Sequence, residues 1–449
     1  MRILLVNPMN SGYYYRLGAV YPPLGLCYIS SVLKNAGNSV KLIDMNVESF
    51  DWKHFNYSDF DIVGVSTDTV RFPLAREISL TAKAQGVITV LGGPHVSAEY
   101  GQILTEQVCD YVILGEGEYT FEKLVQSLQN NERYPLLDGL CYLRDGVIFA
   151  KPAKLIEDLD HLPLPDRENS KLYRTKFDRK PATSVITSRG CPFDCEFCSA
   201  SQFMGRVVRK RSVENVIEEL KQVKDLGYGS VIFFDDNFTI EKHRTIELCE
   251  QMMKNRLDFS WWAFSRADEL LGKEDLLEAM ARSGCKMLFI GFESAEDEVL
   301  NEYEKKLSSS IALEVAKLLK KYKIDLFASF IMGALNDTKE SIKKTVQMAK
   351  KLGAQIVQFS ILTPYPGTRL YEKLKKKISV KDLSLFDGTN LVFDHPKFSS
   401  KDLKKLFVKA YYSVYTAPRL IFTRGLPFLI KLLKTREKTI TMEIAHQKT

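Results

Sequence analysis

The sequence predicts an α/β fold in two parts, a doubly wound domain followed by a partial barrel of strand–helix units. In the first 125 residues, short apolar runs such as RILLVNP and YVILGEGE alternate with helix-length segments such as LGLCYISSVLKNAG. Apolar strands separated by helices indicate a parallel sheet covered on both faces. From about residue 181 the alternation resumes with six further strand candidates, from TSVITSRG to IVQFSILTPYPGT. Such repeated units are typical of a (β/α)6 barrel of the TIM type, whose active site lies at the carboxyl ends of the strands.

On this pattern the chain divides into four segments. Residues 1–135 form the doubly wound, Rossmann-like domain, and residues 136–180 contain a hairpin, LLDGLCYLRDGVIFA, and a proline-bearing linker. We expect the partial barrel over residues 181–390 and a basic helical region over residues 391–449. Ligands of the first domain are expected beyond the carboxyl ends of its strands.

The composition is that of an ordinary globular protein, with 45% hydrophobic and 27% charged residues. The start, MRILLVNPMN, passes from one arginine directly into a strand, so we expect no signal peptide. No apolar run has the length of a transmembrane helix. Eight cysteines in 449 residues are too few for a disulfide scaffold. We therefore expect a cytoplasmic protein, in which clustered thiols are metal ligands or redox groups.

Three cysteines lie close together in SRGCPFDCEFCSAS, directly after the first barrel strand: Cys191, Cys195 and Cys198. A closed zinc site needs four ligands, and a disulfide framework needs an even number of cysteines. Three thiolates can instead bind three irons of a [4Fe–4S] cluster and leave the fourth iron open to another ligand. The alternative is a zinc site with a distant fourth ligand such as His243 or Cys285.

The Cys-x3-Cys-x2-Cys spacing, with Phe197 before the third cysteine and a barrel around it, resembles the radical S-adenosylmethionine (SAM) superfamily. The resemblance implies that the amino and carboxylate groups of SAM bind the open iron. Reductive cleavage of SAM would give a 5′-deoxyadenosyl radical that abstracts a hydrogen atom from the substrate. An external electron donor of the ferredoxin or flavodoxin type is implied as well.

The resemblance also implies a set of SAM-binding positions, most of them at the ends of barrel strands. These are Phe197, Asp235, Asp236, Asn237, Arg266, Glu293 and Gly333. The FFDDN segment stands where the superfamily has a Gly-Gly-Glu-like stretch for the SAM amino group. Arg266 would pair with the carboxylate, Glu293 with the ribose hydroxyls or the amino group, and Gly333 would let the backbone approach the adenine. Each position is also explained by a helix cap or a turn.

An α/β domain in front of such a barrel resembles the cobalamin-binding subfamily of these enzymes, over residues 1 to about 390. The motifs that carry the resemblance are YPPLGLCYISSVLKNAG, LGGPHVSAEY and VILGEGEYTFEKL. Cobalamin domains of the mutase type carry Asp-x-His-x-x-Gly after the first strand. The matching positions here are Asn7, Met9 and Gly12, so we expect no histidine below the cobalt.

Further cobalamin contacts are implied at the ends of three successive strands, where glycines permit a close approach of the backbone. They are Ser66, Thr67, Gly92, Gly93, His95, Gly115, Glu116 and Gly117. The alternative is a Rossmann-like domain whose glycines only form turns. The LGEGE segment lacks the G-x-G-x-x-G spacing of a dinucleotide site, which disfavours that alternative.

The combined resemblance implies an enzyme that makes a carbon radical on its substrate and transfers a methyl group to that carbon from methylcobalamin. A second SAM would restore the methylcobalamin. Two alternatives stay open. Some relatives resemble the anaerobic cyclase of chlorophyll synthesis, which forms a ring on a tetrapyrrole or similar compound. A non-catalytic cobalamin or iron–sulfur regulator is the alternative from a different class.

The C-terminal region, SSKDLKKLFVKAYYSVYTAPRLIFTRGLPFLIKLLKTREK, predicts two amphipathic helices, broken near Pro418 and Pro427. Leu403, Phe407 and Tyr411 fall on one helical face. One interpretation is a helical cap over the barrel mouth with a solvated basic face. The other is a peripheral contact with a membrane surface or a lipid substrate. Nucleic acid is not expected, because the basic residues are mixed with bulky aliphatic ones. The substrate is then a small molecule or a lipid.

Overall fold

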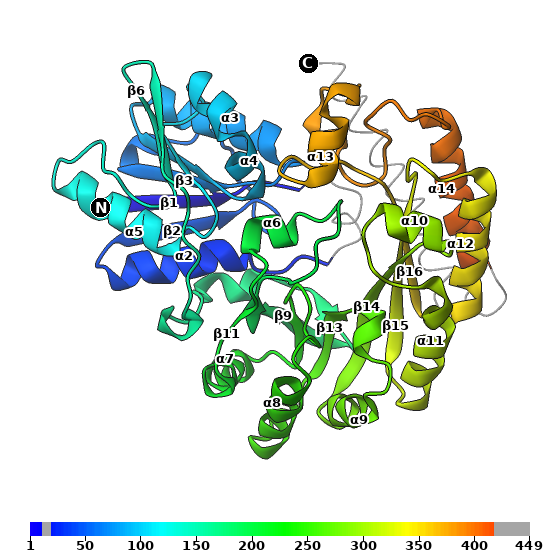
Figure 1. The fold of residues 1–449 in the computed structure, drawn as a ribbon. Coiled ribbons are helices and arrows are strands. Elements are labelled where there is room, and N and C mark those ends of the chain that lie inside the picture. The colour runs from blue at the N-terminus through cyan, green and yellow to red at the C-terminus, as the bar shows by residue number, and fades with distance from the viewer. Residues whose placement is uncertain (11–18, 417–449) are drawn as a thin grey trace.

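The computed structural model describes residues 1–10 and 19–416, which fold into two large sheets flanked by helices. The N-terminal sheet lies beside the sheet of the second half, and the helices of that second half cover the outer face of its sheet (Figure 1). The predicted α/β fold, a doubly wound domain followed by a partial barrel, is confirmed.

The first sheet has the strand order β2-β1-β3-β4-β5-β6-β7. Its parallel strands are β1 (Arg2–Asn7), β2 (Ser39–Asp44), β3 (Ile62–Ser66), β4 (Ile88–Gly92) and β5 (Tyr111–Ile113). The helices that cover it are α2 (Leu24–Asn35), α3 (Phe72–Ala84), α4 (Pro94–Thr105) and α5 (Glu118–Gln129). Apolar side chains of β1 pack into separate cores on the two faces, Leu4 and Val6 on one and Ile3 and Leu5 on the other.

The predicted hairpin forms β6 (Leu140–Arg144) and β7 (Val147–Ala150). β6 pairs antiparallel with β5, so the hairpin extends the first sheet. The segment after the hairpin then leads to the short strand β8 (Lys176–Phe177), which pairs with β9 (Lys180–Val185) at the start of the second sheet.

The second sheet has the order β16-β15-β14-β13-β12-β9-β8. Six of its strands run parallel: β9, β12 (Ser230–Phe233), β13 (Ser260–Ser265), β14 (Cys285–Glu293), β15 (Asp325–Met332) and β16 (Ile356–Ile361). The helices between them are α7 (Val213–Asp225), α8 (Lys242–Lys254), α9 (Glu274–Arg282), α10 (Asp297–Glu302), α11 (Ala312–Lys321) and α12 (Lys339–Leu352). Because β16 and β8 end the order, the barrel is open on one side.

Side chains alternate between the two faces of these strands, as the pleat requires. In β13 the fully buried Trp261 belongs to the core beneath the helices, whereas Trp262 and Phe264 are only partly buried. The same alternation places Phe289 of β14 and Phe327 of β15 among the partly buried side chains. These residues line the concave inner face of the open barrel.

Helix α14 (Ser400–Tyr415) closes the free edge of the sheet. The Tyr411 hydroxyl accepts from the Phe359 N–H and donates to the Phe359 carbonyl, both at 3.0 Å. The Tyr415 hydroxyl bonds the N–H and carbonyl of Val357 in the same way. The first predicted tail helix is therefore present, but it lies along β16 and not over the barrel mouth. The second predicted tail helix lies outside the described residues.

Candidate functional site

The three cysteines of the predicted cluster share one loop, between β10 (Ser188–Arg189) and α6 (Ala200–Met204). Cys195 is buried, and Cys191 and Cys198 are partly buried. The Cys198 N–H donates to the Cys195 carbonyl at 3.1 Å. Burial raises the pKa of the Cys198 thiol to about 11 and also raises the pKa of Cys191, with the neighbouring cysteines adding to both shifts. A cationic iron–sulfur cluster that replaced the thiol protons would stabilise the thiolates and so remove the free-energy cost of ionising them.

A glycine and an aspartate fix the start of this loop. Gly190 has a φ of +95°, and a Cβ there would lie 2.5 Å from the Val207 carbonyl oxygen. The Gly190 N–H donates to the Asp236 carboxylate at 3.1 Å. The end of β12 therefore holds the loop at the carboxyl edge of the barrel, where the active site of such a barrel lies.

Within the described ranges, no three His, Cys, Asp or Glu side chains are grouped as ligands of a single metal ion. The zinc alternative requires such a group. His243 is exposed on α8, and Cys285 begins β14, at the opposite end of the barrel from the cysteine loop. A [4Fe–4S] cluster instead takes one thiolate on each iron, so its cysteines surround it without converging on one point. The donor set fits such a cluster held by Cys191, Cys195 and Cys198.

The FFDDN segment, which was predicted to bind the amino group of SAM, contains two kinds of polar side chain. One is held by hydrogen bonds within the fold, and the others remain accessible to a ligand. Asp235 is buried and accepts from the Thr187 N–H and hydroxyl and from the Ser188 hydroxyl, so its carboxylate is committed to the β9–β10 connection. Burial raises its pKa despite those bonds. Asp236 is solvent-exposed and bonds Gly190. The Asn237 side chain is 3% exposed, and its amide nitrogen has no hydrogen-bond partner.

Arg266 lies against the cysteine loop. Its guanidinium carbon is 3.6 Å from the centre of the Phe193 ring, and it pairs in a fork with Asp268 at 3.1 Å. The same side chain donates to the Lys305 carbonyl at 3.0 Å. The predicted carboxylate partner of SAM is thus beside the cluster loop, held in one orientation by three contacts.

Glu293 and Lys305 form a buried ion pair of 2.7 Å. Glu293 has a φ of +62°, and a Cβ on Gly291 would lie 2.2 Å from its carboxylate oxygen. Lys305 was not predicted, since it falls in the charged stretch NEYEKKLSSS with no pattern that distinguishes it. Gly333 donates its N–H to Asp337 at 2.9 Å, with a φ of +86°. Its backbone N–H is therefore engaged within its own turn.

Phe197 packs edge-on against Tyr303, with ring centres 5.2 Å apart. The loop also contacts the short helix α13 (Arg369–Leu374): Arg369 donates to the Asp194 carbonyl, and the Leu370 N–H donates to the Glu196 carbonyl. The start of α13, directly after the PYPGT turn, therefore supports the cysteine loop. A Cβ on Gly367 in this turn would lie 3.1 Å from Ala98 of α4, so the turn also touches the first domain.

The predicted cobalamin residues follow the carboxyl ends of four strands, β1, β3, β4 and β5. Asn7 is buried between Asp44 and Arg71, donating to the first and accepting from the second. Met9, two residues past the end of β1, is 51% exposed, and Gly12 lies outside the described residues. A Cβ on Gly93 would come within 2.3 Å of the Thr67 carbonyl oxygen, and the two loops meet there. Arg71, which sequence reasoning missed, also donates to Asp68 at 3.0 Å.

His95 lies in the first turn of α4 and is buried, with its ring centre 4.3 Å from that of Phe72 and the two rings tilted by 42°. Its Nδ1 is 3.3 Å from the Thr69 hydroxyl oxygen. Burial lowers the pKa of His95 to about 4, so the imidazole is neutral near pH 7. His95 therefore contacts the loop between β3 and α3, through Thr69.

Gly92, Gly93, Gly115 and Gly117 line a cavity of about 160 Å³, together with Ser66 and residues of the barrel. Glycine walls leave room for a flat or extended group against the backbone. Glu116 borders the cavity too, but its carboxylate accepts from Arg189 and Arg209 of the barrel and from the Ile156 N–H. Glu116 therefore ties the domains together.

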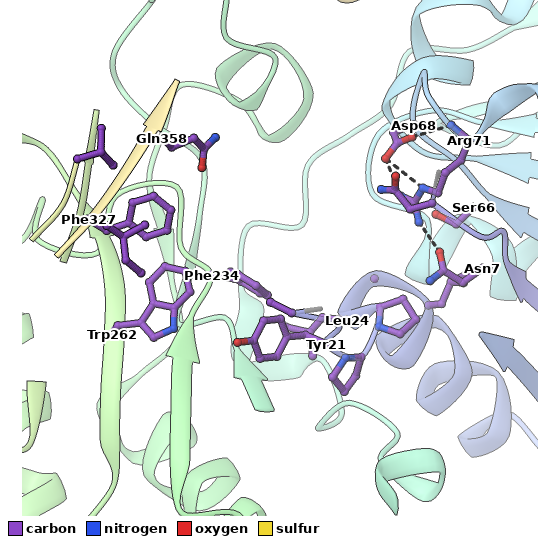
Figure 2. A pocket seen from close by; sticks show the side chains of 18 of the residues that line it. Asn7, Tyr21, Leu24, Ser66, Asp68, Arg71, Phe234, Trp262, Phe327 and Gln358 are labelled. Atoms are coloured by element: carbon purple, nitrogen blue, oxygen red, sulfur yellow. Dashed lines mark hydrogen bonds and ion pairs between the residues drawn. The ribbon is translucent and has the colours of Figure 1, made fainter. Parts of the chain in front are cut away.

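A larger cavity of about 810 Å³ lies between the two domains (Figure 2). Asn7, Ser66, Asp68 and Arg71 line one side of it. Phe234, Trp262, Phe327 and Gln358 line the other side, on the barrel. Tyr21 and Leu24 lie between the two groups in Figure 2. The cavity thus joins the strand ends of the first domain to the concave face of the barrel.

Comparison with known proteins identifies both parts of this arrangement. The model of the radical SAM superfamily matches residues 185–349, and that of the B12 binding domain matches residues 13–125. An uncharacterized methyltransferase of Pyrococcus horikoshii is 35% identical over 433 residues, which are 94% of this chain and 94% of that protein. The chain belongs to the cobalamin-binding radical SAM family.

This membership confirms the predicted enzyme class and the three predicted cofactors, a [4Fe–4S] cluster, SAM and cobalamin. The anaerobic magnesium-protoporphyrin IX monomethyl ester cyclase of Rubrivivax gelatinosus is 29% identical, over 86% of this chain and 72% of that protein. Among solved structures, the radical SAM methyltransferase TsrM of Kitasatospora setae superposes with a TM-score of 0.71 at 20% identity, over 84% of this chain and 78% of that one. That likeness shows that the two folds agree.

The Asn237 amide and the Arg266 guanidinium fit the polar end of SAM, because both are hydrogen-bond donors and an acceptor at Asn237 would satisfy a buried donor that has no partner. The glycine-lined cavity and the strand ends around Asn7 fit an edge and a tail of cobalamin. Within the described residues, no helix is long and apolar enough to cross a membrane.

Proposed function

We propose that this enzyme transfers a methyl group from cobalamin to an unactivated carbon of a small organic substrate bound in the interdomain cavity. The observation that carries the proposal is the cavity of about 810 Å³, which is bordered by the cobalamin-domain strand ends and by the concave face of the barrel. A substrate in it can meet chemistry from both domains. When bound, the cluster and SAM supply a carbon radical on the substrate, and cobalamin supplies the methyl group.

The chain's own residues position these partners. Arg266 is pre-oriented by Asp268 and Phe193, so a carboxylate can bind it with little loss of side-chain entropy. The pairs of Arg189 with Glu116 and Glu118 hold the cobalamin domain against the cysteine loop. Aromatic side chains on the barrel side keep water away from the reacting carbon.

The overall balance defines the products. One substrate C–H bond, two SAM molecules and two electrons give the methylated product, 5′-deoxyadenosine, methionine and S-adenosylhomocysteine. The hydrogen atom leaves on 5′-deoxyadenosine, and the methyl group comes from the second SAM by way of cobalamin. The electrons come from an external donor of the ferredoxin or flavodoxin type, which is part of the proposal.

The test uses anaerobically reconstituted protein, a chemical reductant, and SAM with a deuterated methyl group, together with candidate substrates. We expect a product heavier by one deuterated methyl group, with 5′-deoxyadenosine and S-adenosylhomocysteine formed in equal amounts. Formation of 5′-deoxyadenosine with a dehydrogenated, unmethylated product would instead support the ring-forming alternative. Failure of the reduced protein to cleave SAM at all would contradict the proposal.

A further inference from the structure

One layer of side chains crosses the inner face of the barrel and is almost entirely aromatic. In strand register, Phe264 of β13 pairs with Phe289 of β14, Phe289 with Phe327 of β15, and Phe327 with Ile356 of β16. Phe234, just past the end of β12, has its ring centre 5.9 Å from that of Phe264. Neighbouring ring centres are 5.0 Å apart at Phe264–Phe289 and 4.7 Å apart at Phe289–Phe327. We call these five residues the aromatic floor.

The floor is continued toward the first domain by two further rings. Trp262 lies one inward position below Phe264 and has its ring centre 5.2 Å from it. Tyr21, from the segment that leads into α2, packs edge-on against Phe234, with ring centres 5.4 Å apart. Burial raises the pKa of Tyr21 to about 12, so its hydroxyl stays neutral. Of these side chains, Phe234, Trp262, Phe327 and Ile356 line the barrel side of the cavity, and Phe264 and Phe289 pack beside them.

The rings of the floor do not share a plane. The interplanar angles are 35° between Phe234 and Phe264, 52° between Phe264 and Phe289, and 62° between Phe289 and Phe327. A flat conjugated ligand gains most from a ring parallel to it, and it could stack on only one of these rings at a time. A three-dimensional aliphatic skeleton can instead touch every ring through its C–H groups, and these dispersion contacts add up.

Among the described residues that line the cavity, none offers an unpaired charge to a ligand. Of the residues that line it in the described part of the chain, only Asp68 and Arg71 are charged; they pair with each other at 3.0 Å on the side of the first domain. Above the floor, Glu293 is neutralised by Lys305. A ligand carboxylate or ammonium would lose its hydration on the barrel side without gaining a partner, which is strongly unfavourable. Gln358 of β16, one inward position above Ile356, is a polar side chain that lines the cavity on this side.

We propose that the substrate is an uncharged, non-planar and largely aliphatic molecule that rests on the aromatic floor, with the Gln358 amide meeting its polar or unsaturated end. This inference rests on the proposed function and specifies its substrate class. It separates the lipid-like substrates from the flat tetrapyrroles and the charged amino acids that the same reaction could modify.

The test is equilibrium binding to the reconstituted holoenzyme in a mild non-ionic detergent. The probes are hopene, a polycyclic hydrocarbon; protoporphyrin IX dimethyl ester, a flat uncharged macrocycle; and tryptophan, a charged amino acid. We expect hopene to bind at least about tenfold more tightly than the porphyrin ester, and tryptophan not to saturate. Tighter binding of the porphyrin ester or of tryptophan would overturn the proposal.

A substitution that introduces a charge into the cavity tests whether hopene binds there. Gln358→Glu should weaken hopene binding by about tenfold or more, because the new carboxylate must lose water when the hydrocarbon enters. Gln222→Glu, which adds the same charge on the exposed face of α7, should leave it unchanged. Equal hopene affinity in wild type and Gln358→Glu would overturn the proposal. Bound iron, bound cobalt and SAM cleavage are measured on the same samples. A wild-type protein that lacks them would contradict the proposed function. A wild-type protein that has all three but prefers another probe would overturn only the substrate class.

Discussion

The guanidinium of Arg189 donates to the carboxylate of Glu116 at 2.7 Å, across the boundary between the two domains. Arg189 ends the short strand β10, two residues before Cys191, and Glu116 lies in the loop between β5 and α5. Both side chains are almost completely buried, and Glu118 and Arg209 extend the pair into a network. The loop that carries the cluster cysteines is thus fastened directly to the glycine loop of the cobalamin domain.

Breaking this pair should destabilise the protein and misalign its two domains. Glu116→Gln leaves Arg189 and Arg209 with one carboxylate fewer, and the loss of one partner of a buried ion pair costs about 3–5 kcal/mol. We expect a lower midpoint in anaerobic urea unfolding. In the protein that remains folded, we expect more 5′-deoxyadenosine per methylated product.

The exposed Glu314→Gln on α11 is the matched control and should change neither quantity. A Glu116→Gln protein with wild-type stability and wild-type product ratio would show that the pair does not fix the domain interface.

Each cysteine of the loop should be needed for iron but not for cobalamin. Cys191→Ser should reduce bound iron to near background and abolish SAM cleavage, since an alkoxide is a poor ligand beside thiolates. Cobalt should be retained, because the first domain has its own core. Cys27→Ala, a change at a buried cysteine in α2, is the control and should keep both metals. Iron retained in Cys191→Ser would contradict the assignment.

The two tyrosines on the edge strand should contribute measurably to stability. Tyr411→Phe removes one hydrogen bond to the Phe359 N–H and one to its carbonyl, and each such bond contributes about 0.5–1.5 kcal/mol to stability. Tyr415→Phe should act similarly at Val357. The neighbouring Tyr412 is 63% exposed, so Tyr412→Phe should unfold like the wild type. Unfolding free energies from denaturant titration compare the three variants directly.

His95 should make the protein less stable in mild acid. Its pKa is about 4 in the folded chain, below the ordinary value of 6.5, because burial disfavours the imidazolium. The unfolded chain therefore binds a proton first as the pH falls. The stability associated with neutral His95 is full above about pH 6.5 and is lost between there and about pH 4, by up to about 3 kcal/mol.

The measurement for His95 is the difference in unfolding free energy between about pH 7 and about pH 5. His95→Gln removes the titrating group, so this difference should become smaller than in the wild type. An equal difference in both proteins would show that His95 does not titrate on unfolding.

The sequence predicted the fold well because its signals are local. Runs such as SVIFF and IVQFSI became β12 and β16 at the expected places, and the cysteine spacing marked the cluster loop within one connection. The partners of single polar residues could not be predicted in this way. Asp235 and Glu116 stand in glycine- and acid-rich strand ends, as ligand-binding residues do, yet their carboxylates bond Thr187 and Arg189 in distant segments.

The aromatic floor, too, could be predicted only in part from the sequence. FSWWAFS alternates with a period of two, so the sequence could separate Trp261 and Ala263 from Trp262 and Phe264. Which of the two sets faces the helices depends on the curvature of the whole sheet and on the helices around it. Only the structure shows that Trp262 lines the cavity and that Phe264 stands in register with Phe289 and Phe327 of later strands.

The most direct test of the account is the metal content of the protein after anaerobic reconstitution with iron, sulfide and hydroxocobalamin, followed by desalting. The account predicts about four irons and one cobalt per chain, because a cubane is held by three cysteines in one domain and a corrin by the other. The visible spectrum should show both chromophores. Four irons without cobalt would contradict it, since the first domain would then bind something other than cobalamin.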